Sequence, residues 1–205
     1  MKHEKFEGKM NQLILLLPTL IKINIAFLIS SLLVVTIIPS FAALNRQIIE
    51  IKNGQISTKP VARYIELLKK DFRRNIVFGV FYTSLVLFLC LDIALALSVR
   101  TMMFKIIAYL FGSLLVMVLF SLQYLIPLLA RYNQPIKWYI KTSILMSIKY
   151  FRETMLLFII SLFPFVILYV ANMFFFTILL VMIVCGYAIT MILQNHVLIK
   201  RVFVE

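Results

Sequence analysis

The chain has few acidic residues and contains long stretches without any charge. Of its 205 residues only 8 are aspartate or glutamate, and residues 154–199 hold no charged side chain at all. Charged residues make up 14% of the chain, whereas a soluble domain usually has about 25%. Because about 20 apolar residues in a helix cross a bilayer about 30 Å thick, this stretch alone is long enough for two membrane spans.

Residues that build metal and catalytic sites are scarce. The two cysteines, Cys90 and Cys185, fall in apolar stretches, and His3 and His196 lie at opposite ends of the chain. Such a set supplies no zinc shell and predicts no disulfide. The chain also lacks a glycine-rich phosphate loop, an HExxH or GxSxG motif and a pair of carboxylates within a span. We therefore predict no enzymatic activity, no cofactor and no metal.

Stretches of membrane-span length recur along the whole chain. The pattern predicts an all-α, polytopic membrane helix bundle that forms a single membrane domain over residues 1–205. Residues 10–21 are apolar but too short to cross, so residues 1–21 are interpreted as an interfacial or re-entrant segment. The five predicted spans cover residues 22–45, 75–99, 105–130, 153–171 and 173–197.

The 21 lysine and arginine residues predict the orientation. The connections at residues 46–74 and 131–152 hold most of them, and such residues concentrate on the cytoplasmic side of a membrane. With five spans this places the N-terminus outside and the C-terminus inside. If residues 10–21 also crossed, both termini would be inside. The side of the N-terminus therefore stays open, whereas both long connections are cytoplasmic in either case.

Both cytoplasmic connections predict basic amphipathic helices that begin at Pro60 and Pro135. The apolar positions are Val61, Tyr64, Ile65, Leu68 and Phe72 in the first, and Ile136, Ile140, Ile144 and Ile148 in the second. Anchoring to anionic lipid of the inner leaflet explains such helices. Docking to a cytoplasmic or membrane partner through aromatic anchors, Tyr139 among them, is the alternative. The candidate lipid- or partner-binding residues are Arg63, Tyr64, Phe72, Arg73, Arg74, Lys137, Trp138 and Lys141.

Asp92 is the single acidic residue in the interior of a predicted span, because Glu153 stands at the first position of its span. A carboxylate at the centre of a membrane helix costs about 2.5–3.5 kcal/mol, so Asp92 needs a partner or a polar pocket. Lys22 and Asn24 are predicted at a similar depth in the first span. We therefore expect Asp92 to pair with Lys22 or Asn24, or to line an outward-open polar pocket with them.

Four short segments resemble one bacterial membrane protein family. They are KIN at residues 22–24, TIIPSFAAL at 36–44, DFRRN at 71–75 and PLLARYN at 127–133. With these segments the chain resembles the YesL-like membrane proteins, a family of unknown function. Members are often encoded beside carbohydrate ABC uptake transporters. The resemblance thus implies an accessory role in sugar uptake and supplies no catalytic residues.

Taken together, the sequence favours a protein of the bacterial cytoplasmic membrane that acts by binding. The leading hypothesis is an accessory subunit or an assembly or regulatory factor of a membrane complex, with a carbohydrate ABC transporter as the expected partner. Anionic lipid is a second expected partner, and nucleic acid is not expected because the cationic residues flank membrane spans. The alternative is a small stand-alone transporter or lipid-handling protein with a polar pocket near Asp92.

Overall fold

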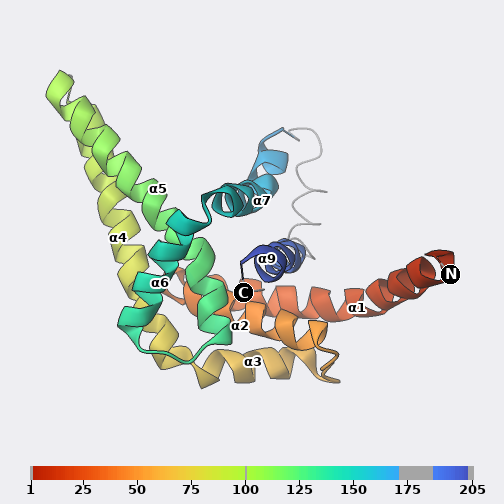
Figure 1. Ribbon diagram of the computed structural model, residues 1–205. Coiled ribbons are helices and arrows are strands. Elements are labelled where there is room, and N and C mark those ends of the chain that lie inside the picture. Colours follow the sequence, from red (N-terminus) through yellow and green to blue (C-terminus); the bar gives the residue numbers. More distant parts are fainter. Residues whose placement is uncertain (1, 100, 171–186, 203–205) are drawn as a thin grey trace.

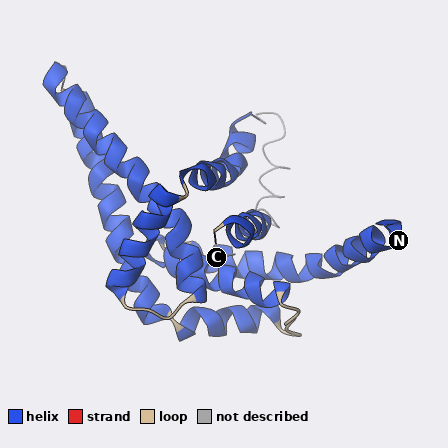
Figure 2. Cartoon of the chain, viewed as in Figure 1, coloured by secondary structure: helices blue, strands red, loops and turns tan. Residues whose placement is uncertain are grey.

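All regular secondary structure is helical in the part of the chain that the computed structural model describes, residues 2–99, 101–170 and 187–202 (Figure 1, Figure 2). The elements are α1 (Lys2–Ser31), the short 3-10 helix η1 (Val34–Thr36), α2 (Ile37–Lys52), α3 (Pro60–Lys70), α4 (Phe72–Ser98), α5 (Met102–Arg131), α6 (Ile136–Lys149), α7 (Phe151–Val170) and α9 (Tyr187–Arg201). The prediction of an all-α fold is confirmed for these residues.

Within the described residues, three helical segments are long and apolar enough to cross a membrane: Val34–Lys52, Phe72–Ser98 and Met102–Arg131. The last two, α4 and α5, cover the predicted spans at residues 75–99 and 105–130. The predicted spans at residues 153–171 and 173–197 lie partly outside the described residues. The structure is therefore compatible with membrane insertion.

The first predicted span is not one helix. α1 ends at Ser31 and α2 begins at Ile37. The rings of Phe27 and Phe41 are 4.7 Å apart, and the Ser30 hydroxyl lies 2.9 Å from that of Ser40. Such pairing makes α1 and α2 an antiparallel hairpin (Figure 1). The predicted span at residues 22–45 therefore does not coincide with one helix, and no helix boundary falls at residue 21, because α1 continues through Pro18 to Ser31.

Two features stabilise the turn of this hairpin: side-chain hydrogen bonds and close packing against α4. The Thr36 hydroxyl lies 2.6 Å from the carbonyl oxygen of Ser30 and 2.7 Å from that of Leu33. The last carbonyl groups of a helix have no intrahelical hydrogen-bond donor, so a side-chain hydroxyl can bind them. Such side-chain hydrogen bonds compete with continuation of the helix. The Val35 carbonyl also approaches Gly79 so closely that a Cβ there would lie 2.2 Å from its oxygen. The chain therefore turns back where a hydropathy pattern shows only continuous apolar sequence.

α4 and α5 form a long pair that projects away from the other helices (Figure 1). We call residues 72–85 and 118–131 its proximal half and residues 86–99 and 101–117 its distal half. The proximal half contributes most of the pair's buried side chains, among them Phe78, Tyr82, Tyr124, Leu125, Leu128 and Leu129. Most side chains of the distal half are exposed and apolar. The core of the described residues therefore surrounds one end of the pair.

The two predicted amphipathic helices exist as helices, but their buried faces differ from the prediction. α3 buries Tyr64 and Leu67, and Val61 and Ile65 are exposed. α6 buries Tyr139, Ser143 and Ser147, whereas the Ile148 side chain is 61% exposed. Small serines let one helix approach another closely, and α6 packs along α5. The predicted isoleucine face of α6 is therefore only partly buried, at Ile140 and Ile144.

Candidate functional site

A polar pocket lies where α2, the α3–α4 boundary and the end of α5 meet. Its volume is about 150 Å3, and we call it the cationic junction. Side chains distant in sequence converge here because the hairpin brings α2 against both α3 and α5. The residues that line it are Arg46, Lys70, Asp71, Arg74, Ala130, Arg131, Tyr132 and Asn133.

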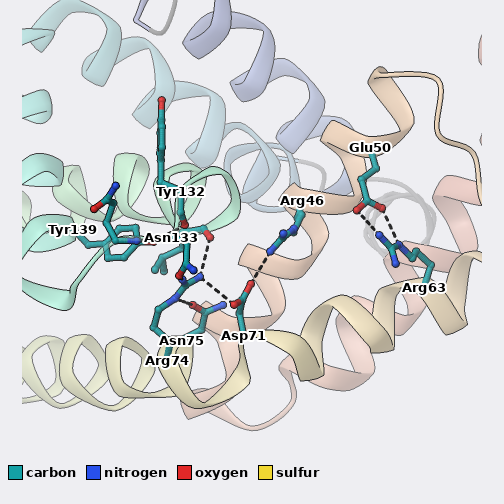
Figure 3. A network of polar contacts seen from close by, with 11 residues as sticks. Arg46, Glu50, Arg63, Asp71, Arg74, Asn75, Tyr132, Asn133 and Tyr139 are labelled. Atoms are coloured by element: carbon teal, nitrogen blue, oxygen red, sulfur yellow. Dashed lines mark hydrogen bonds and ion pairs between the residues drawn. The ribbon is translucent and has the colours of Figure 1, made fainter.

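Asp71 holds two arginines of the cationic junction in place (Figure 3). It lies between α3 and α4. Its Oδ2 accepts a hydrogen bond from Arg46 Nη1 at 2.6 Å, and its Oδ1 lies 3.5 Å from Arg74 Nη2. Because Arg46 belongs to α2, this one carboxylate connects α2 with the beginning of α4.

Arg74 connects α4 with the segment that follows α5. Its Nη1 donates to Asn133 Oδ1 at 2.6 Å and its Nη2 to the Leu129 carbonyl oxygen at 3.3 Å. Its guanidinium carbon lies 5.5 Å from the centre of the Tyr139 ring, within the range of a cation–π contact. Arg74 is therefore fixed by bonds within the chain (Figure 3).

A second ion pair joins α3 to α2 beside the cationic junction. Arg63 donates from Nη2 and Nε to the two carboxylate oxygens of Glu50, at 2.8 and 3.0 Å, and from Nη1 to Glu66. The hydrogen bonds that Arg63 donates to the carboxylates of Glu50 and Glu66 raise its pKa above the ordinary value. The pair is partly exposed, so its net contribution to stability is about 1 kcal/mol at most. Its main effect is to fix the register of α3 on α2.

Arg131 extends the polar contacts toward α9. Its Nη2 donates to Asn195 Oδ1 at 3.1 Å, and the Asn195 amide donates to Asn45 Oδ1 at 2.8 Å. Both asparagines are buried. Helices α5, α9 and α2 are thus tied together at the level of the cationic junction. Among the described residues, four cationic side chains, Arg46, Lys70, Arg74 and Arg131, line this pocket together with one carboxylate.

The structure separates the predicted lipid- or partner-binding residues into four groups. Tyr64 is fully buried, with its hydroxyl 2.6 Å from that of Ser30, which corrects its prediction as a surface anchor; Tyr139 is fully buried as well. Arg63 and Arg74 are engaged within the chain. The exposed residues of the set are Arg73, Lys137 and Lys141, and the half-buried ones are Phe72 and Trp138.

Sequence reasoning missed Arg46, Lys70, Asp71, Arg131 and Asn133 as parts of one site. A signal was present, because Asp71 lies in the DFRRN segment, and Arg131 and Asn133 lie in the PLLARYN segment. The structure brings these two segments to one pocket.

The predicted cluster of Asp92, Lys22 and Asn24 is not brought together. Asn24 is fully buried, and its Oδ1 accepts a hydrogen bond from the backbone N–H of Ala188 in α9. Lys22 is exposed, and Asp92 is half-buried on the distal half of the α4–α5 pair. Within the described residues no hydrogen bond or ion pair joins Asp92 to either of the others. The structure thus gives no support to a polar pocket of these three residues.

Comparison with known proteins gives one match. Residues 20–93 match the model of a family described as "Protein of unknown function, DUF624". The matched segment includes the α1–α2 hairpin, α3, and Arg46, Lys70, Asp71 and Arg74 of the cationic junction. Neither the curated proteins nor the solved structures contain a significant match. The comparisons therefore assign no activity.

Proposed function

We propose that the protein is an integral protein of the bacterial cytoplasmic membrane that acts by binding, as an accessory or assembly subunit of a larger membrane complex. The observation that carries this proposal is the distal half of the α4–α5 pair. Most of its side chains are apolar and exposed, and few other parts of the described chain cover them. Large exposed apolar surfaces are interaction surfaces for lipid or protein.

The α1–α2 hairpin supports an orientation for this protein. The apolar part of α1, Leu16–Ser31, rises about 24 Å at 1.5 Å per residue, less than the hydrocarbon thickness of about 30 Å. We therefore infer that the hairpin enters and leaves the membrane on one side. If α4 and α5 cross, and residues 154–199 cross twice as their length predicts, all lysines and arginines except Arg100 and Lys105 lie on that same side. By the positive-inside rule this side is the cytoplasm, and both termini lie there.

A shallow, open groove on the exposed face of α4, mostly in the proximal half and reaching the distal half at Phe88, offers a second apolar surface for a partner helix. Its volume is about 700 Å3. Its wall is almost entirely apolar, as expected for a contact between helices in lipid. The residues that line it are Ile76, Val77, Val80, Phe81, Ser84, Leu85 and Phe88. We propose that a transmembrane helix of another subunit occupies this groove, and the resemblance described above makes the permease of a carbohydrate ABC transporter the first partner to test.

Site-specific photocrosslinking in living cells tests this proposal. A photoreactive residue at Val80, inside the groove, is expected to crosslink to a transporter permease. The same residue at Ile65, exposed on α3, is the matched control and should give no such product. If Val80 crosslinks only to lipid or to a second copy of this chain, the proposed role as a subunit is wrong.

A further inference from the structure

We propose that the cationic junction is a binding site for a single phosphate group. The phosphate belongs to an anionic phospholipid of the cytoplasmic leaflet or to a small soluble phosphate compound. This inference does not depend on the partner subunit proposed above, because it concerns a pocket formed by this chain alone.

The balance of charge in the pocket is the first argument. Among the described residues that line it, Arg46, Lys70, Arg74 and Arg131 are cationic and Asp71 is the single acidic one. Even with Asp71 ionised, these five side chains together carry three more positive than negative charges. Like charges held together repel, most strongly where water is partly excluded, and a bound dianion or monoanion relieves that repulsion.

The fixed geometry of the arginines is the second argument. Asp71 and Asn133 accept hydrogen bonds from Arg46 and Arg74 at 2.6 Å each. An arginine whose position is already set loses little conformational freedom when it binds an anion, and a guanidinium matches the geometry of phosphate oxygens. Lys70 adds a cation that forms no hydrogen bond or ion pair with any described residue. The pocket thus combines preorganised donors with one adjustable cation.

The place of the pocket in the fold favours the lipid source. Arg131 is the last residue of a candidate span, and Arg74 is the third residue of another. A residue at the end of a span lies at the level of the lipid headgroups. Basic pockets between helices on the cytoplasmic side are a recognised binding mode for anionic headgroups. A lipid phosphate therefore reaches this pocket without leaving the membrane surface.

Lys70 and Lys69 provide a matched pair of variants. Both are exposed neighbours at the end of α3, but only Lys70 lines the pocket. The purified full chain is placed in nanodiscs of phosphatidylcholine with increasing phosphatidylglycerol, and bound phosphatidylglycerol is measured by native mass spectrometry. Lys70→Gln is expected to weaken binding about fivefold, and Lys70→Glu more strongly, whereas Lys69→Gln leaves binding close to wild type.

A second arm distinguishes the two sources. Inorganic phosphate and glycerol phosphate are added to the detergent-solubilised chain, and binding is measured by the shift in thermal unfolding. Saturable, Lys70-dependent binding of phosphatidylglycerol alone identifies a lipid site. Lys70-dependent binding of the soluble compounds identifies a soluble ligand. Equal loss of binding in the Lys69→Gln and Lys70→Gln variants, or no saturable binding in either arm, would overturn the proposal.

Discussion

The proximal and distal halves of the α4–α5 pair have the same apolar character but different surroundings. The proximal half packs against α2 and α6 and contains Gly79, against which the turn of the α1–α2 hairpin packs. The distal half presents residues such as Leu87 and Tyr109, which are 59% and 77% exposed. The position of the proximal half is therefore set by the chain itself. The position of the distal half depends on what surrounds the protein, which under the proposed function is lipid or another subunit.

A charge on the distal half provides the most severe test of this comparison. Leu87 is exposed near the middle of α4, so Leu87→Arg places a cation at bilayer depth. Insertion scales give a cost of about 2.5–3.5 kcal/mol, so the inserted fraction of α4 should fall strongly in a membrane insertion assay. Ile65→Arg on α3, outside the candidate spans, is the control and should insert normally. Equal insertion of both variants would show that this face of α4 does not contact lipid.

Substitution of two helical glycines, one in each half, compares the packing of the two halves directly. A Cβ at Gly79 would lie 2.2 Å from the Val35 carbonyl oxygen, whereas a Cβ at Gly112 in the distal half has no neighbour within 4 Å. Gly79→Ala must displace backbone, so we expect a loss of about 3 kcal/mol in unfolding free energy. Gly112→Ala should be neutral or gain up to about 1 kcal/mol, because alanine favours a helix. Thermal unfolding in detergent measures the stability of both variants. Similar changes in stability would contradict the close packing of the hairpin turn on α4.

Two tyrosine hydroxyls give a smaller contrast. The Tyr139 hydroxyl donates to the Tyr132 carbonyl oxygen and accepts from the Gln134 N–H, and so fixes the chain between α5 and α6. Tyr139→Phe should cost about 1–2 kcal/mol because both bonds are lost. Tyr109→Phe, at an exposed position in the distal half, should cost little. A loss of stability in the Tyr109 variant equal to that of Tyr139 would mean that the distal half is packed as well.

Helices that follow from the length of an apolar stretch can be predicted from the sequence. α4 and α5 are predictable because long apolar stretches favour helices, and Pro60 and Pro135 mark where α3 and α6 begin. The end of α1 at Ser31 cannot be predicted from the hydropathy pattern. It depends on the absent side chain of Gly79, 44 residues from Val35, and on the Thr36 hydroxyl.

The candidate site was only partly predictable for the same reason. Basic residues of the two connections were recognised by their position in sequence, which is why Arg74 was found. Arg46 and Arg131 join the pocket only through the packing of α2 and α5 on the α3–α4 boundary. Their charges resemble ordinary cytoplasmic flanks of a span. Tertiary structure determines which cations of a connection share one carboxylate. Composition and periodicity do not predict this.

Alkaline pH provides the finest test of the packed region. Burial raises the pKa of the Tyr64 phenol above its ordinary value of 10.0. Below about pH 10 the phenol is neutral in both the folded and unfolded states. Above it the unfolded chain loses the proton first, so stability falls as pH rises through the folded pKa, by at most about 1.4 kcal/mol per pH unit.

The Tyr64→Phe variant separates this titration from the contacts of the hydroxyl. Losing the bonds to Ser30 and Ser40 should lower stability by about 1 kcal/mol at pH 8, where no titration contributes. Above pH 10 the variant should lose stability less steeply than the wild type, because it has no phenol at this position. Unfolding is followed by circular dichroism from pH 8 to 11.5. Parallel pH profiles would show that the Tyr64 hydroxyl is solvated, and that α3 is not packed beneath the hairpin.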